Sequence, residues 1–108
     1  MLIDIFGAAQ IREVRLDKKK LRIARKKIDL LDKKIFKLIK KRTQIVKYML
    51  SLKKFKSQIV DHKRISKILR NIKNKSIKEG VDSKTTQQIW KSIIWSFVDF
   101  QRRNFKNK

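Results

Sequence analysis

The sequence contains no proline and only two glycines, and this scarcity of helix breakers constrains the fold more than any other feature. Proline removes a backbone hydrogen bond and glycine adds conformational freedom, so both residues interrupt helices. The chain is dominated instead by Ile, Leu, Lys and Arg, a composition that suits long uninterrupted helices. We therefore predict an all-α fold. At 108 residues the chain has the length of a single domain.

A long first helix is predicted over residues 17–53, because apolar residues recur three and four positions apart from residue 21 to residue 49. Such a helix is about 50 Å long, which is more than a compact domain of this size can cover. We therefore expect it to pack against a second chain. Residues 1–16 show no clear period and are predicted to be an N-terminal extension to a helical domain over residues 17–108.

Two further helices follow from local signals. Residues 56–58 lose the apolar period and predict a loop, after which Asp61 is expected to begin a short second helix that ends at Gly80. Asp82 or Ser83 is expected to cap a third helix of medium length. The predicted order is therefore one long, one short and one medium helix.

The formal net charge of +23 is compatible with a nucleic acid, an anionic membrane surface or small anions as partners, and it does not choose among them. The chain has no cysteine and one histidine, His62, which excludes a disulfide framework and a thiolate or histidine metal cluster. No window approaches the ~18 apolar residues of a membrane span. We therefore expect a cytoplasmic protein without a metal or a membrane segment.

Polar side chains interrupt the predicted apolar faces. Arg42 stands where the spacing calls for an apolar residue, and Lys53 faces the same way about 16 Å further along the helix. Gln101 falls on the apolar track of the third helix. Considered alone, it is explained as well by a buried structural amide as by contact with a ligand. Burying an unpaired charge is costly, so Arg42, Lys53, Arg64 and Gln101 together predict a pocket for an anion.

Two other positions have more than one interpretation. Asp61 and Arg64 are three residues apart at the start of the second helix, so either an ion pair or a helix cap is available to them. Arg25 lies about 100° around the first helix from Arg42. It is therefore expected to serve a symmetry-related pocket rather than the pocket of its own chain.

The spacing of these residues as a set is similar to that of the all-helical chorismate mutases. The segments that carry the resemblance, within residues 21–105, are Arg25–Asp32, Leu38–Arg42, Lys53, Ile59–Arg64, Gly80–Asp82 and Ile93–Gln101. The resemblance implies a homodimer of three-helix chains, an intertwined six-helix bundle in which each active site borrows an arginine from the other subunit.

The resemblance also implies a substrate site. Its residues would be Arg25 from the partner subunit, Arg42, Lys53, Asp61, Arg64 and Gln101. The arginines would hold the substrate carboxylates, Lys53 and Gln101 would contact the ether oxygen, and Asp61 would shape the pocket near the ring hydroxyl. The implied reaction is the pericyclic Claisen rearrangement of chorismate to prephenate, which needs no metal, cofactor or general base.

Two positions depart from the family pattern. Ile65 stands where a glutamate often contacts the ring hydroxyl, and Phe97 stands where a serine is expected. Isochorismate-pyruvate lyases share the fold and the basic cage, and they resemble this chain in lacking that glutamate. A lyase that produces salicylate and pyruvate is therefore the alternative activity.

Two other classes compete with an enzyme. The net charge and the aromatic residues Phe55, Trp90, Trp95 and Phe100 suit a nucleic-acid-binding protein. However, no known binding motif is present and the basic residues form no single helical stripe, so a nucleic-acid partner is not expected. A non-catalytic interaction module is the other class, and the retention of the whole predicted pocket argues against it.

Overall fold

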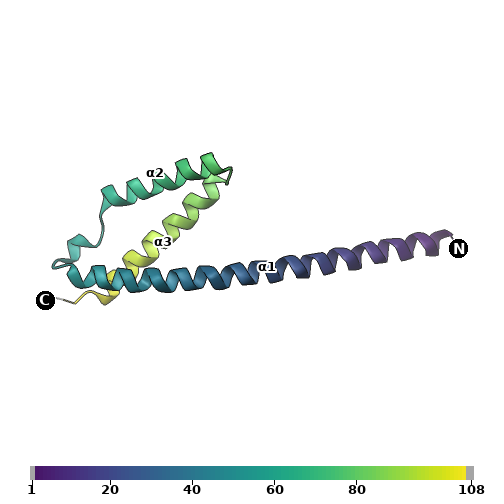
Figure 1. The fold of residues 1–108 in the computed structure, drawn as a ribbon, viewed down its shortest axis with the longest axis horizontal. Helices are drawn as coiled ribbons and strands as arrows, with labels where there is room; N and C mark the ends of the chain where they lie inside the picture. Colours follow the sequence, from purple (N-terminus) through teal and green to yellow (C-terminus); the bar gives the residue numbers. More distant parts are fainter. Residues whose placement is uncertain (1, 107–108) are drawn as a thin grey trace. The chain divides into compact units, whose positions relative to one another are not determined.

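The computed structural model describes residues 2–106, which fold into three α-helices with no strand among them (Figure 1). Helix α1 spans Leu2–Leu52, α2 spans His62–Glu79 and α3 spans Ser83–Asn104. A 3₁₀ turn, η1, covers Lys56–Gln58 between α1 and α2, where the sequence predicted a loop. The predicted all-α class and the order of long, short and medium helices are confirmed.

Helix α1 is longer than predicted. It begins at Leu2 rather than at residue 17 and contains 51 residues. The predicted start was wrong because it relied on apolar periodicity, which residues 2–16 lack. An established helix gains one hydrogen bond for each added residue and needs no amphipathic pattern to continue. The division into an extension over residues 1–16 and a domain over residues 17–108 stays a prediction.

The chain divides into two compact units, Met1–Lys41 and Arg42–Lys108. In the first unit, the side chains from residue 10 to residue 41 are exposed except for Ile39, which is half-buried. The exposed apolar side chains of this stretch include those of the predicted stripe, namely Leu21, Ile28, Leu31, Ile35 and Leu38. None of the helices formed by residues 2–106 is apolar enough along its length to cross a bilayer.

The second unit holds a small apolar core. Leu50 near the end of α1, Ile59 after η1 and Val98 on α3 form one buried cluster, and Val60 and Phe105 pack against it. This cluster joins segments that lie far apart in the sequence, so it fixes the end of α1 against α3. Lys53 lies three residues after Leu50 and Gln101 lies three residues after Val98, so the same cluster positions both of these predicted site residues.

Helices α2 and α3 form a hairpin whose ends follow the predicted signals. Asp61 caps α2 by accepting a hydrogen bond from the backbone N–H of Arg64. Gly80 ends α2 with a φ of 70°, a conformation that strains residues with a Cβ atom. Asp82 caps α3 by accepting from the backbone N–H of Thr85.

One buried polar contact ties α2 to α3. The Oγ atom of Ser76 and the Oγ1 atom of Thr86 lie 2.7 Å apart, and Ser76 also donates to the carbonyl of Ile72. Ser76 is only 5% exposed. Because buried hydroxyls are costly unless they are hydrogen-bonded, this contact specifies the register of the hairpin.

Candidate active site

A hydrogen bond between Lys53 and Gln101 lies at the centre of the candidate site. Lys53 follows the last residue of α1, and its backbone N–H still donates to the carbonyl of Leu50 at 3.1 Å. Its Nζ atom donates to Oε1 of Gln101 at 2.6 Å. Gln101 is on α3, is 8% exposed, and donates from Nε2 to the carbonyl of Phe97 at 3.2 Å. Both side chains are therefore held in place.

The ammonium of Lys53 is partly withdrawn from water. Burial lowers the pKa of Lys53 below its ordinary value of 10.5, and the negative charge of Asp61 acts in the opposite direction. An ammonium has three N–H donors, and the bond to Gln101 uses one of them. Lys53 therefore offers further donors to an anionic or electron-rich group.

Lys53 and Asp61 also line one shallow depression on the surface of the second unit. The other residues that line it are Gln58, Val60, His62 and Lys63. This depression places a cation, a carboxylate and several hydrogen-bonding groups around one small volume. Within residues 2–106, no three His, Cys, Asp or Glu side chains gather closely enough to hold a metal ion.

The sequence predicted that Arg42 points inward to a pocket, but the structure shows no burial of this side chain in its own chain. Its side chain is exposed, and the guanidinium carbon lies 5.6 Å from the centroid of the Phe97 ring, within the range of a cation–π contact. The three-four count places Arg42 among apolar positions, yet its side chain stays exposed despite the contact with Phe97. Phe97, which the sequence marked only as a departure from a family pattern, is the support for this arginine.

The relationship between Asp61 and Arg64 is a helix cap. Oδ1 of Asp61 accepts from the backbone N–H of Arg64 at 3.0 Å, and the two side chains form no ion pair. The guanidinium of Arg64 is exposed, contrary to the inward orientation predicted for it. The cap occupies one carboxylate oxygen of Asp61 and leaves Oδ2 available to a ligand.

The remaining predicted residues lie at distinct places. Arg25 is exposed on α1 in the first unit, and its role in a partner's site stays a prediction. Ile65, in the place of the family's glutamate, is half-buried on α2. The structure thus brings Lys53 together with Gln101, and Arg42 together with Phe97.

A family model described as chorismate mutase type II matches residues 24–102. That stretch contains every residue of the predicted site and covers well over half of the chain. No curated protein and no solved structure is significantly similar to the chain.

Proposed function

The chain belongs to the chorismate mutase type II family, the all-helical chorismate mutases, and we propose from this premise that it rearranges chorismate to prephenate. The reaction is intramolecular. The ether C–O bond breaks while a new C–C bond forms within the same molecule, so atoms and electrons balance without a proton donor, an oxidant or a cofactor. An enzyme for this step needs to hold a compact substrate conformation and to stabilise developing charge.

The single observation that carries the proposal is the bond between Lys53 and Gln101. Negative charge develops on the ether oxygen as the C–O bond breaks. Preorganised donors at that position stabilise the transition state more than the substrate. Lys53 retains donors beyond the one given to Gln101, and the second N–H of the Gln101 amide is also available.

The substrate's two carboxylates need cationic partners. Arg42 and Arg64 are exposed cations of the second unit, and neither forms an ion pair with a described residue. Arginine binds carboxylates through two parallel hydrogen bonds, which fixes orientation as well as supplying charge. In our proposal these arginines, with Arg25 of a second copy, hold the dianion. The net charge of +23 steers it towards them.

The same proposal requires a homodimer. Leu21, Ile28, Leu31, Ile35 and Leu38 form one apolar face of α1, and each is at least 49% exposed in the single chain. A continuous apolar face of this length is uncommon on a monomeric protein. A second copy packed along α1 covers it and brings Arg25 to the neighbouring site. Size-exclusion chromatography with light scattering then gives twice the 13.0 kDa of one chain.

An isochorismate-pyruvate lyase is the second candidate, and Ile65 with Phe97 favours it. Both side chains are half-buried and apolar where the family pattern has a glutamate and a serine. An apolar lining does not accept a hydrogen bond from the substrate's ring hydroxyl in the position used by chorismate mutases. The lyase would act on isochorismate and release salicylate and pyruvate.

One assay separates the two activities. Purified protein is incubated with chorismate and with isochorismate in parallel, while chorismate absorbance and salicylate fluorescence are followed. Loss of chorismate without salicylate supports the mutase, and salicylate from isochorismate supports the lyase. The Lys53→Ala variant, purified in the same way, serves as the blank, because any activity from contaminating enzymes is present in both preparations. Activity on neither substrate contradicts both proposals.

A further inference from the structure

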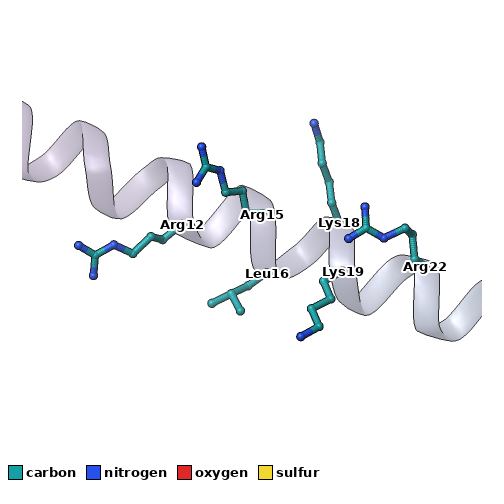
Figure 2. Close-up of a pocket in the computed structure, with 6 residues that line it drawn as sticks. All are labelled: Arg12, Arg15, Leu16, Lys18, Lys19 and Arg22. Carbon is teal, nitrogen blue, oxygen red and sulfur yellow. The ribbon is translucent and has the colours of Figure 1, made fainter.

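The early part of α1 carries a row of cations on one face. Because α1 begins at Leu2, residues 12–26 share one helical register. At about 100° per residue, six of the basic residues in this stretch fall within an arc of about 120°, and no residue of another kind from 12–26 lies in that arc. We call these six residues the basic stripe: Arg12, Arg15, Lys18, Lys19, Arg22 and Lys26. Figure 2 shows the first five of them, together with Leu16, projecting from one stretch of the helix.

The charge of the basic stripe is not neutralised within the described chain. All six side chains are exposed, and none forms an ion pair or hydrogen bond with another described residue. The two acids of this stretch, Glu13 and Asp17, lie about 160° around the helix from the middle of the stripe. The positive field is therefore concentrated along one side of α1.

The basic stripe holds six of the 32 basic residues, so it is a local feature and the basic residues of the whole chain still form no single stripe. A helix that started at residue 17, as predicted, would have left Arg12 and Arg15 outside it. The observed helix adds both to the same face. Five of the six residues precede the stretch matched by the family model, residues 24–102, so the rearrangement of chorismate does not account for them.

We propose that the basic stripe binds the phosphate backbone of a nucleic-acid duplex. The stripe is about 21 Å long, and it presents its cations on an α-helix, an element whose width the DNA major groove admits. Three of its residues are arginines, which bind phosphates through paired hydrogen bonds. Contacts to phosphates carry no sequence information, so binding through the backbone is expected to be independent of sequence.

An anionic membrane fits this segment less well. A helix that lies in a membrane surface needs one broad apolar face. In residues 12–26 the large apolar side chains lie on two separate sides, with Leu16 and Ile23 about 160° from Val14 and Leu21. A single-stranded nucleic acid is also disfavoured, because no aromatic residue for base stacking occurs in this stretch.

The basic stripe is compatible with the proposed dimer. Its centre lies about 170° around α1 from the centre of the apolar face formed by Leu21, Ile28, Leu31, Ile35 and Leu38. A second copy on that face therefore leaves the stripe accessible. The inference does not depend on catalysis, because it uses the charge and geometry of residues 12–26 alone.

The test compares two full-length variants that each lose four positive charges. The stripe variant carries Arg12→Gln, Arg15→Gln, Lys19→Gln and Arg22→Gln. The control variant carries Lys67→Gln, Arg70→Gln, Lys73→Gln and Lys75→Gln, all exposed positions on α2. Glutamine is a good helix former, so both variants are expected to match the wild type in circular dichroism. Fluorescence anisotropy measures their binding to a labelled random-sequence duplex of about 20 base pairs across a salt series.

We expect the wild type to bind the duplex with an affinity that falls steeply with salt. The stripe variant should bind at least about tenfold more weakly, with a salt dependence shallower by about 3 to 4 in logarithmic slope. The control variant should lose far less affinity, and the stripe variant should keep its turnover of chorismate. An equal loss in the two variants overturns the proposal. So does binding to phosphatidylserine vesicles without binding to the duplex.

Discussion

The ammonium of Lys53 and the amide oxygen of Gln101 lie 2.6 Å apart although 48 residues separate them in the sequence. The bond joins the end of α1 to the last part of α3, next to the small core of Leu50, Ile59 and Val98. The apolar cluster positions the two backbones, and the second hydrogen bond of Gln101, to Phe97, fixes its amide. The fold alone thus holds the pair in one arrangement.

Replacement of Lys53 is therefore expected to remove turnover without unfolding the protein. Loss of one preorganised donor to a developing oxyanion lowers kcat by about 10²–10³-fold in well-studied enzymes, and we expect Lys53→Ala to fall in that range. Lys54→Ala is the matched control, since Lys54 is the adjacent exposed lysine. Equal activity of the two variants, measured with chorismate, would remove Lys53 from the site.

The pH dependence of activity should report the surroundings of Lys53. Burial lowers the pKa of Lys53, so the protonated form is lost, and kcat declines, at a pH below 10.5. Asp61 raises that pKa, and Asp61→Asn should move the alkaline decline to lower pH. Asparagine is as good a helix cap as aspartate, so α2 is retained. Asp82→Asn, at the cap of α3, should leave the decline unchanged.

The ring of Phe97 is expected to support substrate binding through Arg42. Phe97→Leu keeps an apolar side chain at this half-buried position but removes the cation–π contact, which is worth about 0.5–1 kcal/mol at an exposed site. The KM for chorismate should then rise a few-fold while kcat changes less. A Phe97→Tyr variant, which keeps the aromatic face, should restore the wild-type KM. A kcat defect without a change in KM would contradict this role.

The contact between Ser76 and Thr86 should contribute measurably to stability. Ser76→Ala removes a buried hydroxyl and Thr86→Val a half-buried one, and each should lower the free energy of unfolding by about 1 kcal/mol. The double variant should lose less than the sum of the single variants, because either single change already removes the contact between the two hydroxyls. Urea unfolding followed by circular dichroism measures all three. Simple additivity would show that the two hydroxyls act independently.

The two glycines should respond oppositely to the same substitution. Gly80 has a φ of 70°, so Gly80→Ala should cost about 1 kcal/mol through backbone strain, although an added Cβ meets no atom within 4 Å. Gly7 lies within α1 and has the same open space around it. Gly7→Ala should therefore stabilise the helix by up to about 1 kcal/mol. Thermal unfolding of the two variants tests both signs.

Local signals in the sequence predicted the ends of α2 and α3. Asp61, Gly80 and Asp82 act on backbone groups within a few residues of themselves, so their positions alone identify the helix boundaries. The start of α1 was missed because residues 2–16 have no amphipathic pattern. Continuation of an existing helix does not depend on such a pattern.

The candidate site was predictable only in part. Gln101 was identified because an amide on an apolar track calls for a partner, but its bond to Lys53 was not predicted. The contact between Arg42 and Phe97 had no local signal, since these residues come from different helices. The exposure of Arg42 and Arg64 was also not predictable, because periodicity reports which face is apolar and not what covers it.

The small size of the buried core has a thermodynamic consequence. Among the described residues, only Leu50, Ile59, Ile94 and Val98 are buried apolar side chains. Hydrophobic stabilisation scales with the area removed from water, so one isolated chain gains little of it. In the proposed dimer, most of the free energy that opposes unfolding then comes from association, and mass action makes it depend on protein concentration. Dilution alone should lower the midpoint of thermal unfolding, and the amount of protein in a cell would set the fraction that is folded.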